Sequence, residues 1–128
     1  MKSTELGAAI RAAACTPAES LDGGGVGRDY RFAADFIGFS GHFPGAPILP
    51  AIAQIEMGRL LIEEWLGSPL RLLAVDHAKF LKPVRPGELL RLECRILSRD
   101  GTLVCEVRLA CDDQPVAGFR LSLDETEG

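Results

Sequence analysis

Three stretches in the last third of the chain alternate apolar and polar side chains, the pattern of strands with one buried face. Residues 90–96, 103–111 and 117–123 each place an apolar side chain at every second position. Asp100-Gly101 and Asp112-Asp113 lie between them and are typical of tight turns. The pattern predicts three consecutive antiparallel strands whose apolar face another element must cover.

A different pattern runs through residues 51–66, where apolar side chains cover more than the single stripe of a surface helix. Pro50 suits the first turn of a helix, because its missing N–H removes no hydrogen bond there. Gly67 and Pro69 provide a stop. We expect one helix over this range, buried on most sides by the sheet and, in so small a protein, partly by another chain.

The remaining stretches are less regular. Residues 28–34 and 70–81 are predicted as two further strands. Arg85-Pro86-Gly87-Glu88 has proline second and glycine third, which predicts a type II turn. We expect residues 16–27, with three consecutive glycines, to form a flexible loop, and residues 124–128 to form a frayed polar tail.

Length and composition limit the possible architectures. With 128 residues, 47% of them hydrophobic, the chain is expected to form one domain over residues 1–128. Two histidines, and four cysteines without CxxC spacing, give a metal site little to build on, so we expect no metal and no cofactor. The cysteines are expected to be small buried apolar residues in a reducing compartment: Cys15, Cys94, Cys105 and Cys111.

Charge and hydropathy exclude several partners. A formal charge of −4 and a pI near 5.2 argue against nucleic acid. Glu5 and Arg11 interrupt the apolar core that a secretion signal ahead of Cys15 would need. No run approaches the roughly 18 apolar residues of a membrane span. We therefore expect a cytoplasmic protein that binds neither nucleic acid nor membrane.

The candidate chemistry begins with His42, in the sequence GHFPGAPILP. Pro44, Pro47 and Pro50 each fix their own φ and bias the preceding residue to extended geometry. The backbone that carries His42 therefore has few conformations available, and such a loop can hold an imidazole in place for chemistry. The second histidine, His77, follows Asp76 in a predicted strand, and we interpret it as a surface or strand residue.

The second candidate is Glu56, fourteen positions after His42 and inside the apolar run. By helical spacing it shares a face with Ile52, Arg59 and Leu60. In an apolar environment the charged form of a carboxyl is disfavoured, so Glu56 would act as an acid near neutral pH. The alternative is that Glu56 pairs with Arg59 or reaches solvent.

Taken together, this stretch resembles the active-site signature of the hotdog-fold 3-hydroxyacyl-ACP dehydratases, in which a His-Phe-Pro-Gly loop leads into the central helix. The matched positions are His42, Phe43, Pro44, Gly45, Pro47, Pro50 and Glu56. Residues 79–93 are similar, more weakly, to the family's strand, Pro-Gly turn and strand. The resemblance implies an α+β hotdog fold, a curved antiparallel sheet wrapped around one long central helix, and a homodimer or higher homo-oligomer with the active site at the interface.

The reaction that the resemblance implies is dehydration of a 3-hydroxyacyl thioester on acyl-carrier protein to the trans-2-enoyl thioester. His42 would be the base for the C2 proton and Glu56 the acid for the departing hydroxyl. N–H groups near Ala51, in the first turn, would stabilise the thioester oxygen. Substrate contacts would come from Phe43, Gly45, Pro50 and Ala51.

Two positions depart from the family's pattern. Ala51 stands where glycine is usual, and Leu60 stands where glutamine is common. Either could mark a divergent subfamily, such as the aryl-polyene dehydratases, and neither removes a proton-transfer group. Two other functions stay open: a hotdog acyl thioesterase, and a non-catalytic hotdog module that binds acyl-carrier protein or pairs with an active partner.

The resemblance also affects three other segments. Helix propensity alone favours a helix for the alanine-rich residues 4–14, but the family pattern makes 6–14 a strand, and a strand is our prediction. Phe36, Phe39 and Phe43 are expected to pack the loop against the body, or else to line an acyl pocket. Residues 71–95 carry a net charge of +3, either on solvated strand faces or as a patch for an acidic carrier protein or a phosphopantetheine phosphate.

Overall fold

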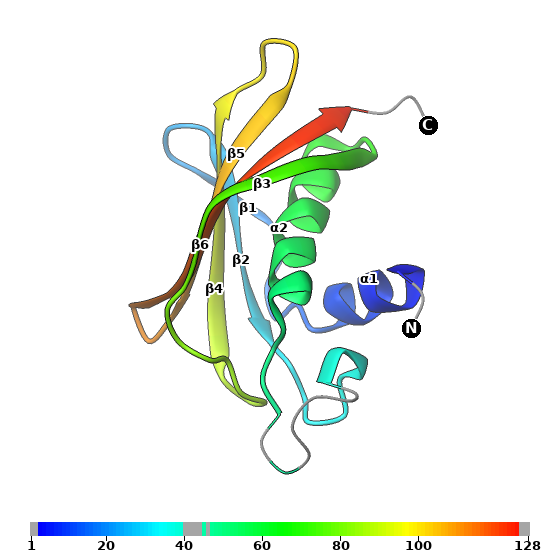
Figure 1. Ribbon diagram of the computed structural model, residues 1–128, viewed down its shortest axis with the longest axis vertical. Helices are drawn as coiled ribbons and strands as arrows, with labels where there is room; N and C mark the ends of the chain where they lie inside the picture. Colours follow the sequence, from blue (N-terminus) through cyan, green and yellow to red (C-terminus); the bar gives the residue numbers. More distant parts are fainter. Residues whose placement is uncertain (1–2, 40–44, 46, 126–128) are drawn as a thin grey trace.

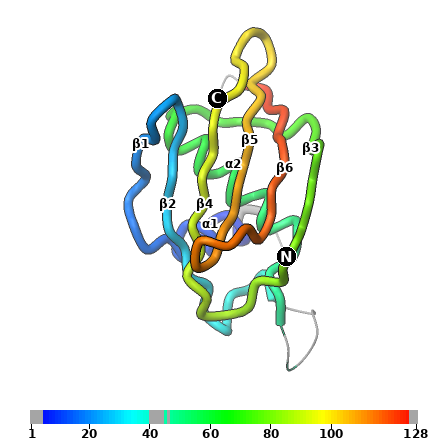
Figure 2. The backbone as a smooth tube through the Cα atoms, turned by 90° about the vertical axis from the view of Figure 1, so that its left-hand side faces the viewer, coloured from blue at the N-terminus to red at the C-terminus, as the bar shows by residue number. Residues whose placement is uncertain are grey.

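The computed structural model of the protein describes residues 3–39, 45 and 47–125. One six-stranded antiparallel sheet, in the order β1-β2-β4-β5-β6-β3, lies against helix α2 (Figures 1 and 2). The strands are β1 Glu19–Leu21, β2 Gly25–Arg31, β3 Leu70–Phe80, β4 Leu89–Ser98, β5 Leu103–Cys111 and β6 Gln114–Glu125. The helices are α1 Ser3–Ala12, the short 3-10 helix η1 Ile37–Phe39 and α2 Ala51–Leu66.

The sheet curves around α2, which lies behind it when the outer face of the sheet is viewed (Figure 2). Alternate residues of β4, β5 and β6 point inward and form a large part of the core, which is the pattern that the sequence predicted. The helix approaches β5 closely at Gly58, where an added Cβ would lie only 3.1 Å and 3.2 Å from the Val107 methyl groups. The absence of a side chain at Gly58 therefore allows α2 to pack closely against the sheet.

Helix α2 begins and ends where the sequence predicts. Pro50 precedes it with extended geometry, and Gly67 follows it with φ 73°, donating its N–H to the Glu63 carbonyl at 2.8 Å. The helix is less enclosed than expected, because Ala51 is exposed and the Ile52 side chain is 57% exposed.

The predicted strand over residues 6–14 is wrong, because the chain forms helix α1 there. Leu6 and Ile10, four residues apart, are buried on one face of α1, which contacts α2. Strand-like pairing is limited to an isolated bridge between Ala14 and Tyr30. Packing against α2 thus stabilises a short helix that would be marginal alone.

The flexible loop predicted for residues 16–27 is also wrong. This segment contains the β1–β2 hairpin, which turns through Gly23 and Gly24 at φ 84° and 92°. Strand β2 then runs from Gly25 to Arg31, three residues earlier than the predicted strand over 28–34. The glycines specify a turn between paired strands, and pairing with β4 orders the rest of the segment.

The other turns and strand ends mostly agree with the sequence. Glu88 donates its N–H to the Arg85 carbonyl at 3.4 Å with Gly87 at φ 84°, as a type II turn requires. The predicted strand over 70–81 is β3. The frayed tail is wrong for Asp124 and Glu125, which belong to β6; residues 126–128 lie outside the described part of the chain.

The cysteines differ in burial. Cys94 and Cys105 are buried as expected, and burial raises the pKa of the Cys105 thiol to about 11. Cys111 is half-buried, whereas Cys15 is exposed, so the expectation of four buried thiols is wrong for Cys15.

Candidate active site

The loop that should carry the histidine is described only in part. His42, Phe43 and Pro44 lie outside the described residues, so their roles stay predictions. Gly45 is exposed and has φ 89°, a conformation that favours glycine. From Pro47 the chain is continuous into α2, and the buried Leu49 donates its N–H to the Val84 carbonyl at 2.8 Å. The C-terminal stem of the loop is therefore fixed to the segment that follows β3.

The start of α2, where the sequence predicted backbone donors near Ala51, presents N–H groups that are free within the described part of the chain. The Pro50 carbonyl accepts the N–H groups of Ala53 at 3.1 Å and Gln54 at 3.2 Å. Among the described residues, the N–H groups of Ala51 and Ile52 have no hydrogen-bond acceptor. Both residues are exposed at the positive end of the helix dipole, where an oxygen that gains negative charge would be stabilised.

Gln54 is a functional candidate that our sequence reasoning missed. Its side chain is 5% exposed, and Nε2 donates to the Leu49 carbonyl at 3.1 Å. Within the described part of the chain, its Oε1 is buried without a hydrogen-bond partner. Gln54 also lines a small cavity of about 180 Å³ with Ala51 and Phe80. The available signal was one amide side chain in an otherwise apolar first turn.

Glu56 does not lie in the purely apolar environment that the sequence predicted. Its carboxylate pairs with Arg59, from Nη2 to Oε2 at 2.6 Å, and its side chain is 18% exposed. The alternative that the sequence left open, pairing with Arg59, is therefore what the described structure contains. Glu56 is not among the residues that line the cavity beside Gln54.

Arg59 is the centre of a larger network. Its Nη1 donates to Glu63 at 2.8 Å and to the Leu70 carbonyl at 3.0 Å. Glu63 in turn accepts the Leu70 N–H at 2.8 Å. The hydrogen bonds to Glu56 are the main cause that raises the pKa of Arg59 above its usual value. The network links the middle of α2 to the first residue of β3.

The aromatic residues before the loop belong to the core. Phe36 lies between Phe32 and Phe39, with ring centroids 4.5 Å and 5.4 Å apart, and all three are buried. The prediction that Phe36 and Phe39 pack this segment against the body is confirmed. Phe43 lies outside the described residues.

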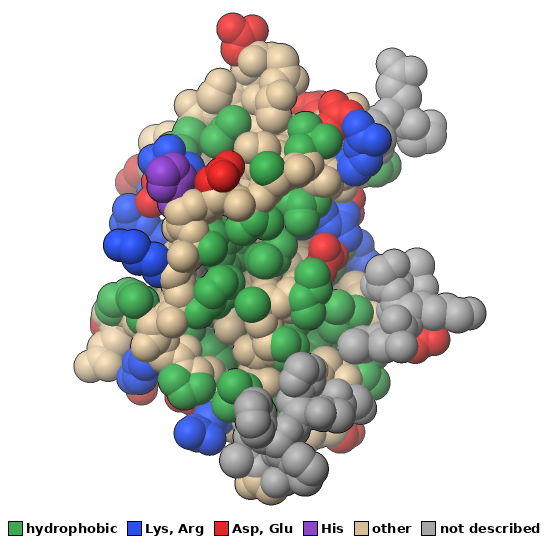
Figure 3. All heavy atoms as spheres, viewed as in Figure 1, with side chains coloured by type: hydrophobic (Ala, Val, Ile, Leu, Met, Phe, Trp, Pro, Cys, Tyr) green, Lys and Arg blue, Asp and Glu red, His purple; other side chains and the backbone are tan. Residues whose placement is uncertain are grey.

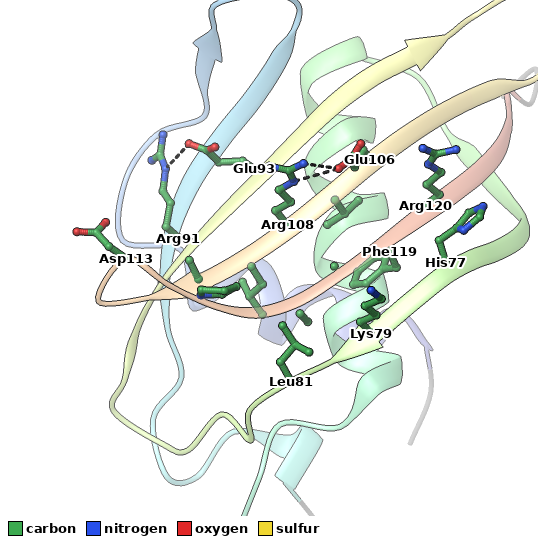
Figure 4. A pocket seen from close by; sticks show the side chains of 16 residues that line it. His77, Lys79, Leu81, Arg91, Glu93, Glu106, Arg108, Asp113, Phe119 and Arg120 are labelled. Carbon is green, nitrogen blue, oxygen red and sulfur yellow. Dashed lines mark hydrogen bonds and ion pairs between the residues drawn. The ribbon is translucent and has the colours of Figure 1, made fainter.

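A larger cavity, of about 720 Å³, lies on the outer face of the sheet, opposite α2 (Figure 4). Its rim carries charged side chains of β3 to β6, with Arg91 paired to Glu93 and Arg108 paired to Glu106. His77 lies at this rim, exposed and at φ 52° beside a β-bulge, which confirms it as a surface residue. Because the sheet separates this cavity from α2, it is not the predicted catalytic site.

The basic stretch over residues 71–95 is neutralised only in part, by ion pairs of Arg71 and Arg91. Arg91 pairs with Glu19, Asp29 and Glu93. Arg71 pairs with Asp124 at 2.9 Å, and Arg95 donates to the Asp22 carbonyl. Lys82 bonds to the neutral Gln114 side chain. Within the described residues four basic side chains of the stretch have no acidic partner: Lys79, Lys82, Arg85 and Arg95.

The described residues contain neither a cluster of metal ligands nor a membrane-spanning helix. No group of three or more histidine, cysteine, aspartate or glutamate side chains there could hold a metal ion. No helix in that part of the chain is long and apolar enough to cross a membrane.

Solved structures with the same arrangement support the fold. The dehydratase heterocomplex ApeI:P from Xenorhabdus doucetiae superposes with a TM-score of 0.74 at 22% identity, over 86% of this chain and 95% of that one. The E. coli PaaI protein superposes with a TM-score of 0.68 at 17% identity, over 95% and 91% of the two chains. These similarities confirm the predicted hotdog fold.

Sequence comparisons give the family. The chain is 39% identical over 92 residues to the 3-hydroxyacyl-[acyl-carrier-protein] dehydratase FabZ of Syntrophobacter fumaroxidans, which is 65% of this chain and 63% of that protein. It is 42% identical over 91 residues to FabZ of Thermotoga maritima, 66% of each chain. These matches span less than two thirds of the relatives' length. The sequence profile described as ApeI-like, ApeI dehydratase, matches residues 22–119, and the chain therefore belongs to the ApeI-like dehydratase family.

Proposed function

We propose that this protein dehydrates a 3-hydroxyacyl thioester, carried on acyl-carrier protein, to the trans-2-enoyl thioester, in fatty acid or polyketide-like biosynthesis. The observation that carries the proposal is membership of a dehydratase family together with a His-Phe-Pro-Gly segment and Glu56 at matching positions. The similarity to proteins named FabZ supports an acyl-carrier-protein substrate.

The proposed chemistry divides among three groups. His42 removes the proton from C2, because imidazole titrates near neutral pH. The exposed N–H groups at Ala51 and Ile52 stabilise the thioester oxygen as it gains charge. Glu56 acts on the departing hydroxyl, directly or through a water, either by donating a proton or by accepting a hydrogen bond. Phe43, Gly45 and Pro50 contact the substrate.

No cofactor takes part in this proposal. The C2–H and C3–O bonds break, the C2=C3 double bond forms, and water leaves, so no electrons enter or leave the substrate. The three protein groups are sufficient for an elimination of this kind, and we propose that residues 1–128 act as one hotdog unit.

We further propose that two copies of the chain pair along the free edge of β3. Four exposed apolar side chains favour this surface, and hydrophobic side chains gather beside β3 and over α2 in Figure 3. They are Ile52, Leu73, Phe80 and Leu81. Pairing would bring His42 of one copy to Glu56 of the other, so that each site uses both chains.

Mixing inactive variants tests this arrangement. In an equal mixture of His42→Ala and Glu56→Gln chains, half of the dimers contain one of each and have one intact site. Mixing after unfolding and refolding should therefore restore about a quarter of the wild-type sites. Failure to recover any activity, with mixed dimers present, would show that each site lies within one chain.

One other function has a specific observation in its favour. The Glu56 carboxylate is already paired with Arg59, as expected if the chain is a non-catalytic module that pairs with an active partner. The ApeI:P protein of known structure is itself a heterocomplex. Purified chain without a second protein distinguishes the two. Turnover by the chain alone excludes the module.

The primary test uses a 3-hydroxyacyl thioester on acyl-carrier protein. We expect conjugated enoyl absorbance and a mass loss of one water, with His42→Ala lowering kcat by about 100-fold or more. Release of free thiol without enoyl product would instead identify a thioesterase. Unchanged turnover in His42→Ala would exclude the catalytic assignment.

A further inference from the structure

We infer that Arg59 is a positioning residue for the reaction: its fork fixes the orientation of the Glu56 carboxylate, so that Glu56 holds the departing hydroxyl as a hydrogen-bond acceptor and does not donate the proton. The inference rests on the proposed dehydration and decides between the two roles given there for Glu56.

The contact between the two side chains is a fork. Arg59 Nε lies 3.2 Å and 3.1 Å from the two Glu56 oxygens, and Nη2 lies 2.6 Å from Oε2. The side chains are 21% and 18% exposed, so water screens the pair only in part. Charge-assisted contacts of this geometry are stronger than neutral hydrogen bonds and hold the carboxylate in one orientation.

Arg59 is itself fixed by other partners. Glu63 and the Leu70 carbonyl bind the Nη1 side of the guanidinium, and the Leu70 N–H binds the same Glu63 oxygen. Arg11 of α1 also approaches Glu63, at 3.8 Å. Moving Arg59 away from Glu56 would break its contacts with the start of β3 as well. The pair is therefore a built feature of α2 and differs from a solvated surface contact.

If Glu56 only accepts a hydrogen bond, the proton that the departing hydroxyl needs must come from His42. His42 takes the C2 proton and becomes imidazolium, while the 3-hydroxyl keeps its hydrogen and donates a hydrogen bond to the Glu56 carboxylate. The imidazolium then returns its proton to the C3 oxygen as the C3–O bond breaks. The C2=C3 bond forms, water leaves, and His42 and Glu56 end in their starting states.

A double-mutant cycle tests whether Arg59 acts through Glu56. We expect Arg59→Met to lower kcat by about 100-fold in the wild-type background, because the carboxylate loses its orientation. In the Glu56→Gln background the same change should cost less than about twofold. Equal losses in the two backgrounds would mean that Arg59 only supports the helix, and the inference would fail. Arg59→Lys, which keeps the charge and loses the fork, repeats the cycle if Arg59→Met does not fold.

A second comparison tests the acceptor role. Glutamine at position 56 keeps an acceptor oxygen but cannot supply an acidic proton, whereas alanine provides neither. We expect Glu56→Gln to be at least about tenfold faster than Glu56→Ala. Equal rates for the two variants would show that Glu56 is the proton donor and would overturn the inference.

The matched control is Arg28, which also donates two hydrogen bonds to a carboxylate of α2. It donates to Glu64 at 3.1 Å and 2.5 Å and to the Thr16 carbonyl at 3.0 Å. Arg28→Met should leave kcat within about twofold of wild type, measured where the protein is folded. A loss as large as that of Arg59→Met would attribute both effects to helix stability. Absence of enoyl product from the wild type would instead refute the proposed function itself.

Discussion

At the scale of single residues, the spacing of the chain predicts which groups can meet but not which contact prevails. Glu56 and Arg59 lie three positions apart, so the sequence already contains the possibility of an ion pair. The second half of the contact, from Arg59 to the Leu70 carbonyl, depends on where β3 begins relative to α2. The position of β3 relative to α2 depends on tertiary packing, which cannot be predicted from the periodicity of the sequence.

Gln54 gives the first prediction. Gln54→Met keeps the length of the side chain and removes both polar groups. Loss of the bond to the Leu49 carbonyl destabilises the protein, whereas loss of the buried, unpaired Oε1 stabilises it. We expect the free energy of unfolding in urea to change by less than about 1 kcal/mol, and kcat to fall about tenfold because the stem of the His42 loop shifts. A large loss of stability with unchanged kcat would give Gln54 a structural role only.

At the scale of elements, periodic segments are predicted well and aperiodic ones are not. The ends of α2 follow from Pro50 and Gly67, and the strands after residue 89 follow from strict alternation. For residues 6–14 alanine propensity favours a helix and the family pattern predicts a strand. The helix forms because Leu6 and Ile10 pack into the core. Short strands such as β1 carry too few residues to show any period.

Two helical glycines give the second prediction. A Cβ at Gly58 meets Val107 at 3.1 Å, whereas a Cβ at Gly7 meets its nearest neighbour at an ordinary 3.6 Å. Gly58→Val should therefore destabilise the protein by about 1–3 kcal/mol through overpacking. Gly7→Ala, the control, should stabilise it by up to about 1 kcal/mol through helix propensity. Thermal or urea unfolding measures both. Equal effects would contradict the close approach of α2 to β5.

The link between β2 and α2 gives a pH-dependent prediction. The hydrogen bonds from Arg28 lower the pKa of the Glu64 carboxyl in the folded protein. The stabilisation is therefore present above the ordinary glutamate pKa of about 4.3 and is lost as the pH falls below it. Since the Glu64 side chain is 45% exposed and water screens the pair, we expect this stabilisation to be less than about 1 kcal/mol. The difference in unfolding free energy between wild type and Glu64→Gln should disappear between about pH 5 and 3. A difference that stays constant over this range would exclude the charged pair as its cause.

At the scale of the whole molecule, sheet order follows from local pairing until the chain reaches β3. Strands β4, β5 and β6 are joined by short turns, so their neighbours are predictable, whereas β3 pairs with β6 across a long separation and leaves one edge free. The alternation of apolar and polar residues in the strands does not predict what covers that edge. The exposed Leu73 side chain on β3 supports our proposal that a second chain covers it.

This free edge gives the last prediction. Leu73 on β3 and Leu97 on β4 are equally exposed, at 49% and 47%, so replacing either with glutamate has a similar effect on the folded monomer. If β3 edges pair, Leu73→Glu buries two charges at the interface and should convert the dimer to monomer in sedimentation velocity. Because the proposed site needs His42 from one copy and Glu56 from the other, dehydration should be lost in the same variant, while Leu97→Glu remains dimeric and active. A monomeric Leu73→Glu protein with full activity would separate the two ideas, leaving the edge as an interface but placing each catalytic pair within one chain.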